Sequence, residues 1–167
     1  MVAIAQGDGS EAVQTAQLDS ASEPTRYSPE RSLYELVGGE EGLRQLVETF
    51  YDVVEFEPDG RDLHRLHMRG HGVAHSRIEQ LNFLSGFLGG PNLYAQKYGH
   101  SNVRQMHEHV EISAEAKDAW LKCMSIAIDR VGLAADARAR LLTPFTRVAT
   151  MLVNQESLAS DTNTLDV

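Results

Sequence analysis

Apolar residues recur at helical spacing in four segments of this 167-residue chain. In chain order these segments are 43–54, about 74–88, 116–127 and 141–152. Steps of three and four residues place such side chains on one face of an α-helix. No alternation of apolar and polar residues lasts long enough to indicate a sheet. The pattern predicts an all-α fold in which two pairs of long helices pack two on two.

Residues that typically begin or end helices lie at the boundaries of these segments. Ser113 is a good N-cap for the third segment, and Gly132 ends it. The Gly-Gly-Pro sequence at 89–91 stops the second segment, because glycine costs backbone entropy in a helix and proline lacks the N–H donor. We therefore predict an ordered turn or loop over 91–101.

Length and composition indicate one folded domain with polar ends. A 167-residue chain with 42% hydrophobic residues can bury a single core. Residues 1–29 and 154–167 hold few large apolar side chains, so they cannot bury enough surface to offset the entropy cost of ordering. We predict a flexible extension at 1–29, a helical domain at 30–153 and a flexible tail at 154–167.

Charge and cysteine content restrict the partners and the compartment. The chain has 24 acidic and 15 basic residues, and a formal net charge of -9 repels nucleic acid and anionic lipid. No apolar run reaches membrane-spanning length, and the N-terminal sequence lacks a secretion signal. Cys123 has no partner for an internal disulfide and is predicted to be a small buried hydrophobe. We expect a cytoplasmic protein without nucleic-acid or membrane partners.

The most informative stretch is 83–107, which reads FLSGFLGGPNLYAQKYGHSNVRQMH. The residues LSG, LGGP, LY and GH, in this order, resemble the group II truncated (2-on-2) haemoglobins, and the resemblance extends from about Tyr34 to about Val153. It implies a truncated globin-like, two-on-two helical sandwich around a haem b group. It also implies that diatomic ligands, oxygen above all, bind at the haem iron.

The resemblance implies which histidine holds the iron. Haem needs a neutral imidazole at one axial position, and His107 occupies the family's histidine after the pattern GH-x-x-[LV]-R, found here at 99–104. His109 is two residues away, so spacing alone permits either histidine, and the resemblance selects His107. The family usually has an arginine before this histidine and a Pro-Phe pair after it. This chain departs from that pattern with Met106 before it and His109-Val110 after it.

The resemblance also implies hydrogen-bond donors on the other face of the haem. Tyr51, in a Phe-Tyr pair, matches the family's distal tyrosine, and Trp120 matches the tryptophan that distinguishes group II. Taken alone, each aromatic residue is more often part of a core. Donors in a water-poor pocket retain oxygen, because oxygen gains negative character when it binds.

Other pocket positions follow from the same resemblance. Gln80 stands where the family commonly has an aliphatic residue, and its amide either donates to the ligand, anchors Tyr51 or lies at a solvent boundary. His67 falls near a position above the haem edge, and either His67 or Gln80 could occupy the sixth iron position. Phe83 and Met106 are further cofactor-binding candidates. Arg104 and Lys97 could replace the missing arginine as the cation that pairs with the haem propionates, with Tyr94 or Tyr98 as hydroxyl donors. For the tyrosines and the two cations, exposure to solvent is the alternative.

A separate metal hypothesis comes from the histidines at 64, 67, 71 and 75. His71 and His75 would share a face if this segment were helical. Gly70 and Gly72 interrupt it, and no carboxylate or cysteine sits at a useful spacing within it, so we favour a surface loop.

Three functional hypotheses remain open at this point. The first is a haem protein that binds oxygen, with nitric oxide, carbon monoxide and peroxide as further small ligands. The second is a nitric oxide dioxygenase or peroxidase-type enzyme. It would need an external reductase, because the sequence contains no flavin or nicotinamide motif. The third is a haem-free helical interaction module, and a homodimer is a further expectation.

Overall fold

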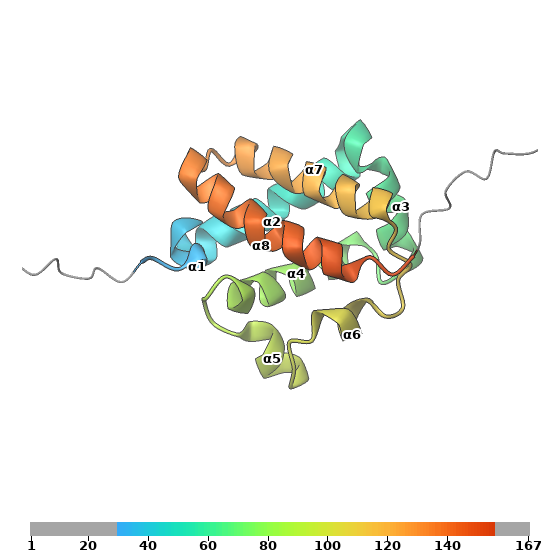
Figure 1. The fold of residues 1–167 in the computed structure, drawn as a ribbon, viewed down its shortest axis with the longest axis horizontal. Helices are drawn as coiled ribbons and strands as arrows, with labels where there is room; N and C mark the ends of the chain where they lie inside the picture. Colours follow the sequence, from blue (N-terminus) through green and yellow to red (C-terminus); the bar gives the residue numbers. More distant parts are fainter. Residues whose placement is uncertain (1–29, 156–167) are drawn as a thin grey trace, which may run out of the picture.

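The computed structural model describes residues 30–155, and within them the chain forms helices and no strand (Figure 1). The long helices are α2 (Gly39–Phe56), α4 (Val73–Phe87), α7 (Ala114–Arg130) and α8 (Ala135–Leu152). The shorter elements are α1 (Leu33–Leu36), η1 (Pro58–Gly60), α3 (Arg61–Arg69), α5 (Leu93–Tyr98) and α6 (Val103–His107). No helix in this part of the chain combines the length and the apolarity needed to cross a membrane.

The predicted extension at 1–29 lies outside the described residues, and so does the predicted tail except for its first two residues. These are Asn154 and Gln155, whose backbone N–H groups donate to the Ile112 carbonyl at 3.0 and 3.2 Å. The Asn154 side chain also accepts from the Ile112 N–H at 2.8 Å. The end of α8 is thereby joined to the segment that leads into α7.

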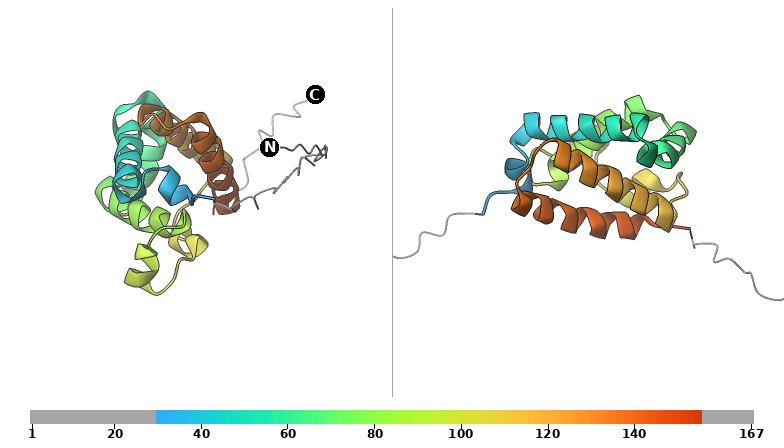
Figure 2. Two further views of the ribbon diagram at one scale, coloured as in Figure 1. Left: turned by 90° about the vertical axis from the view of Figure 1, so that its left-hand side faces the viewer. Right: turned by 90° about the horizontal axis from the view of Figure 1, so that it is seen from above.

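The long helices form two packed pairs. Helix α2 packs against α4, α7 packs against α8, and α2 also lies along α7 and so joins the two pairs. The right-hand view of Figure 2 shows α2 above the α7–α8 pair. Figure 1 shows α5 and α6 on the same side of the molecule as α4. The predicted all-α sandwich of two helix pairs is confirmed.

The core forms where the apolar stripe of α2 meets the other long helices. Its buried members in α2 are Leu43, Leu46, Val47, Phe50, Tyr51, Val53 and Val54. In α7 and α8 the buried members include Cys123, Met124, Ala127, Ile128, Leu141 and Phe145. Burying one large apolar side chain contributes about 1.5–3 kcal/mol, so the stripe decides which face of α2 turns inward. Cys123 is a buried hydrophobe as predicted, and burial raises the pKa of its thiol to about 11.

The Gly-Gly-Pro turn ends α4 and holds the chain close to α1. Gly89 has a φ of +93°, a conformation that favours glycine. A Cβ atom added at Gly90 would lie 2.5 Å from the Tyr34 ring, so only glycine fits there. The Ser85 hydroxyl donates to the Pro91 carbonyl at 2.7 Å. The turn therefore fixes the direction in which the chain leaves α4 toward α5 and α6.

The prediction of a loop over 91–101 is wrong for its middle part, where Leu93–Tyr98 form α5. The sequence LYAQKY contains no helix breaker, and Gly99 ends the helix with a φ of +77°. Six residues are too few to be stably helical alone. Helix α5 packs on α4, and this contact supplies what the local sequence cannot.

The predicted surface loop over the histidine-rich segment is wrong except at His71, which lies in the exposed turn between α3 and α4. Residues Arg61–Arg69 form α3, which buries Leu63 and contacts α2, α4 and α7. Gly70 and Gly72 do separate α3 from α4, as their positions in the sequence indicate. Packing of Leu63 against the long helices overrides the weak local helix signal.

Gly60 allows η1 to approach the helix that carries Tyr51. A Cβ atom at Gly60 would lie 2.4 Å from Val54 Cα and 2.5 Å from Val53 O. Because both are backbone atoms that cannot turn aside, we expect Gly60→Ala to lower the free energy of unfolding by about 3 kcal/mol. Chemical denaturation of the full chain measures this.

Gly99→Ala is the matched control for this prediction. Its added methyl meets open space, but its φ of +77° remains strained for alanine, so we expect a loss of about 1 kcal/mol. Equal losses for the two variants would show that the close approach at Gly60 is unimportant.

Candidate functional site

A cavity of about 410 Å³ is lined by side chains from α2 through α8. Its apolar and aromatic walls include Leu63, Leu66, Phe83, Leu84, Phe87, Val103, Met106, Val110, Ile112, Trp120, Phe145, Val148, Ala149 and Leu152. Its polar side chains include Tyr51, His67, Ser76, Glu79, Gln80, Tyr94, Tyr98 and His107. A mostly apolar cavity of this size with a few polar groups is typical of a small-molecule or cofactor site.

His107 is the last residue of α6 and is half-buried in the cavity wall. Its Nδ1 lies 2.8 Å from the Val103 carbonyl oxygen. Because a carbonyl can only accept, Nδ1 carries the proton and Nε2 of the neutral ring keeps a free lone pair. Burial lowers the pKa of His107 and outweighs the opposing effect of the Val103 carbonyl. The ring is therefore held in the neutral form that can bind a metal ion.

His109, the competing candidate, is exposed and lies at the rim of the same cavity. Its ring centroid is 5.4 Å from that of His71, which in turn lies 4.9 Å from that of His75. These three exposed histidines thus gather on one side of the opening, although they come from different parts of the chain. The sequence linked only His71 and His75.

Tyr51 and Gln80 form a buried polar contact between α2 and α4. The Tyr51 hydroxyl donates to Gln80 Oε1 at 3.0 Å, and only 1% of Tyr51 is exposed. Gln80 Nε2 is buried and has no hydrogen-bond partner. Burial raises the pKa of Tyr51, so its hydroxyl stays protonated at neutral pH. Of the roles left open for Gln80, the contact with Tyr51 is present, and its amide N–H is an additional unused donor.

His67 stands at the edge of this contact. Its Nε2 is 3.5 Å from the Tyr51 hydroxyl oxygen, and its Nδ1 lies 2.8 Å from the Leu63 carbonyl oxygen. The Leu63 contact puts the proton on Nδ1, which leaves Nε2 as an acceptor. Burial lowers the pKa of His67 and keeps the ring neutral. His67 Nε2 is therefore a second acceptor, in addition to Gln80 Oε1, near the Tyr51 hydroxyl.

Trp120 joins the cavity wall to the core. Its ring packs against Phe50 with centroids 5.4 Å apart and against Phe145 with centroids 5.6 Å apart. Such aromatic contacts contribute about 0.5–1.5 kcal/mol each beyond the area that they bury. Trp120 is consequently both a core residue and a lining residue, so the two interpretations of this tryptophan are compatible.

The remaining candidates divide between the cavity and the surface. Phe83, Tyr94, Tyr98 and Met106 line the cavity, whereas Arg104 is exposed and does not. Lys97 is also absent from the lining, and its ammonium donates to Glu79 Oε1 at 2.5 Å. The structure therefore does not bring either of these cations into the cavity.

The sequence did not identify Glu79 as a lining residue. Its Oε2 is buried without a partner. Burial by itself would raise the pKa of this carboxyl, but the Lys97 ammonium and the Tyr98 hydroxyl outweigh it and hold the pKa below its usual value. Glu79 lies four residues before Phe83 on α4, so helical spacing from that predicted lining residue is the signal that could have found it.

Comparison with known proteins identifies the fold around this cavity. Residues 32–154 match the bacterial-like globin family. The group 2 truncated hemoglobin YjbI of Bacillus subtilis is 38% identical over 122 residues, which cover 73% of this chain and 88% of that protein. The chain belongs to the bacterial-like globin family.

Solved structures place this globin among the group II truncated haemoglobins. The group II 2-on-2 hemoglobin of Agrobacterium tumefaciens has a TM-score of 0.70 at 31% identity, and the match covers 78% of this chain and 99% of that one. The truncated oxygen-avid haemoglobin of Bacillus subtilis has a TM-score of 0.66 at 37% identity, and the match covers 74% and 100%. The family predicted from the sequence is confirmed.

Membership of this family implies a haem group and small diatomic ligands such as oxygen. The globin's own residues fit such a group. The cavity walls are largely apolar, His107 offers an unprotonated Nε2, and the buried Gln80 amide has an unused N–H. A metal-binding imidazole, an apolar cavity and an unpaired hydrogen-bond donor suit a haem group and a diatomic ligand.

The contact between Tyr51 and Gln80 gives a direct prediction for this globin. Tyr51→Phe removes the hydroxyl and leaves Gln80 Oε1 buried without a donor, so we expect the free energy of unfolding to fall by about 1–2 kcal/mol. Thermal or chemical unfolding of the full chain measures the change.

Tyr34→Phe serves as the control, because the hydroxyl of this half-buried tyrosine makes no hydrogen bond in residues 30–155. A loss no larger in Tyr51→Phe than in Tyr34→Phe would mean that the buried contact contributes nothing to stability.

Proposed function

We propose that this globin binds haem b through His107 Nε2 and holds oxygen reversibly in the remainder of the cavity. The observation that carries the proposal is the imidazole of His107, which is neutral, half-buried and fixed at Nδ1 by the Val103 carbonyl at 2.8 Å. When bound, haem b supplies an iron to which diatomic gases coordinate. The chain supplies the orientation of the imidazole and the surroundings of the gas.

Gln80 and Tyr51 provide the polar side of this pocket. The Tyr51 hydroxyl holds Gln80 Oε1, which fixes the orientation of the amide and leaves its Nε2 as the free donor. A buried donor without a partner costs about 1–3 kcal/mol. A ligand that accepts this N–H removes that cost, and its release is slowed accordingly.

Trp120 provides the apolar side. It is fixed between Phe50 and Phe145, so its position does not depend on the ligand. Its broad ring excludes water from the cavity, and its indole N–H can only donate. Exclusion of water strengthens the hydrogen bond from Gln80, because no solvent molecule competes for the acceptor.

Oxygen is the ligand that we propose for this pocket. An N–H donor in an apolar cavity retains a ligand that gains negative character, and oxygen does so. The Bacillus subtilis haemoglobin with 37% identity is described as oxygen-avid, and this supports the same ligand here.

The identity of the axial ligand is tested by replacing the two neighbouring histidines separately. We expect His107→Gly to lose most of the bound haem on gel filtration, because the cavity no longer offers a metal-binding nitrogen. His109→Gly is the matched control and should keep the haem, because His109 is exposed at the rim. The readout is the Soret absorbance per protein chain.

Two results would contradict the proposal. If only His109→Gly loses haem, His107 is not the ligand. A folded wild-type protein that takes up no haem would instead support a haem-free interaction module.

The role of the Gln80 amide is tested by Gln80→Leu, which keeps the approximate size of the side chain but removes the donor. We expect the oxygen dissociation rate, measured by stopped flow, to rise about tenfold, which corresponds to the loss of one hydrogen bond. Asn82→Leu makes the same chemical change on the same helix outside this cavity and should leave the rate unchanged. An unaltered rate in Gln80→Leu would remove Gln80 from the ligand site.

A further inference from the structure

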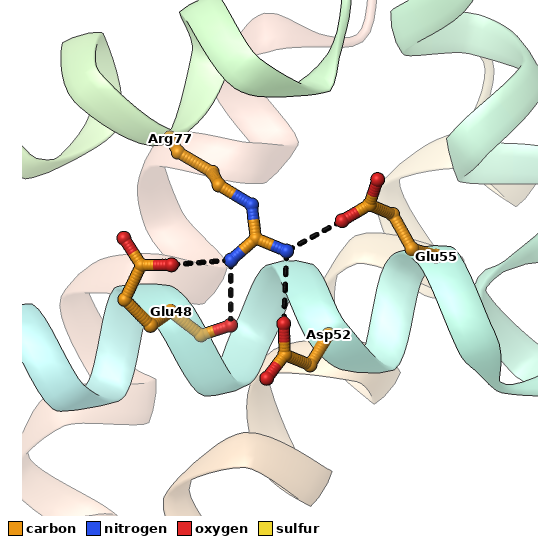
Figure 3. Close-up of polar contacts among 4 residues, drawn as sticks. All are labelled: Glu48, Asp52, Glu55 and Arg77. Carbon is orange, nitrogen blue, oxygen red and sulfur yellow. Dashed lines mark hydrogen bonds and ion pairs between the residues drawn. The ribbon is translucent and has the colours of Figure 1, made fainter.

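Arg77 on α4 reaches across to three carboxylates of α2 (Figure 3). Its Nη1 donates to Glu48 Oε2 at 2.5 Å and to the Glu48 carbonyl at 3.2 Å. Its Nη2 donates to Asp52 Oδ1 at 2.8 Å and to Glu55 Oε2 at 2.5 Å. Figure 3 shows the guanidinium between these side chains, and only 18% of the arginine side chain is exposed. One cation thus joins the outer faces of α2 and α4.

The spacing of the carboxylates explains why an arginine is needed. Residues 48, 52 and 55 lie four and three positions apart, so their like charges share one stripe of α2 and repel one another. A planar guanidinium with several N–H donors can satisfy more than one carboxylate, whereas an ammonium is a point charge. Burial would lower the pKa of Arg77, but its hydrogen bonds to the three carboxylates raise it well above its usual value. The side chain is therefore always charged.

The same guanidinium covers the ring of Tyr51. Arg77 Cζ lies 5.5 Å from the centroid of that ring, within the range of a cation–π contact. Gln80, three residues further along α4, accepts a hydrogen bond from the hydroxyl of the same tyrosine through its Oε1 at 3.0 Å. Two side chains from one turn of α4 therefore hold Tyr51, one at the ring face and the other at the hydroxyl.

We propose that Arg77 is a positioning residue for Tyr51, and through Tyr51 for the Gln80 amide. The inference rests on the proposed function, since it assigns Arg77 to the retention of oxygen in the same cavity. Arg77 ties α4 to α2 at Glu48, Asp52 and Glu55 and covers the tyrosine ring. This arrangement keeps the hydroxyl directed at Gln80 Oε1, so that Gln80 Nε2 points to the ligand.

The test combines Arg77→Gln with Tyr51→Phe in the full chain loaded with haem. We expect Arg77→Gln to raise the oxygen dissociation rate about fivefold, the equivalent of one weakened hydrogen bond. In the Tyr51→Phe background the same change should alter the rate less than about twofold, because two mutations that act through one contact are not additive. Equal effects in the two backgrounds would overturn the proposal.

A second readout does not require haem. In the haem-free chain with labelled tyrosine, the buried Tyr51 hydroxyl proton should exchange slowly enough to give an NMR signal, and Arg77→Gln should abolish it. If the signal persists unchanged, Arg77 does not position the tyrosine. This measurement remains decisive if the chain binds no haem, so the failure of the proposed function and that of the inference are distinguishable.

Two further variants separate positioning from general stability. Arg138→Gln removes the contacts of Arg138 with Asp129 and Ser125 but none of those made by Arg77, so it should lower the melting temperature without changing the Tyr51 signal. Arg77→Lys keeps a positive charge but lacks the planar fork, so the Tyr51 signal should be weakened but present. It also serves if Arg77→Gln does not fold. A normal Tyr51 signal in Arg77→Lys, together with a wild-type oxygen dissociation rate, would contradict the positioning role of the planar guanidinium.

Discussion

Helix α2 packs against α4 and α7 at the same time, and the cavity depends on this double contact. Its apolar stripe must be buried, and the burial orients the neighbouring residues Phe50 and Tyr51 together. Phe50 meets Trp120 of α7, while the hydroxyl of Tyr51 meets Gln80 of α4. Successive residues of a helix are rotated by about 100°. A change in which face of α2 is buried would therefore separate Phe50 from Trp120 and Tyr51 from Gln80. The apolar core therefore determines the polar chemistry.

Some polar groups of the cavity wall are held by hydrogen bonds within their own helix, whereas others are buried without a partner. His67 and His107 each use Nδ1 to contact a carbonyl four residues earlier in their own helix, at 2.8 Å in both cases. These contacts fix each ring and leave each Nε2 without a proton. Gln80 Nε2 and Glu79 Oε2, in contrast, are buried with no partner. Unpaired buried atoms are costly and rare, and a bound ligand is one way in which their hydrogen bonds are completed.

Charge acts mainly on the outer faces of the helices. The chain is acidic overall, but several of its cations are each engaged by particular carboxylates. Arg77 joins α2 to α4, and Lys97 pairs with Glu79 beside the cavity. Exposed ion pairs contribute about 0–1 kcal/mol, so their number explains little of the stability. Arg77 differs from them because it is largely shielded and makes four contacts at once.

The sequence by itself determined the four long helices, the buried stripe of α2 and the ends at Ser113, the Gly-Gly-Pro turn and Gly132. These features depend on residues within one or two turns, and the motif at 83–107 was enough to indicate the family. The short helices α3 and α5 were missed, because contacts with the long helices rather than local sequence stabilise them. Only the tertiary structure decided that Arg104 and Lys97 stay outside the cavity and that Glu79 enters it. It also brought Tyr51 to Gln80 across 29 residues of sequence, a distance that is fixed only when separate helices pack together.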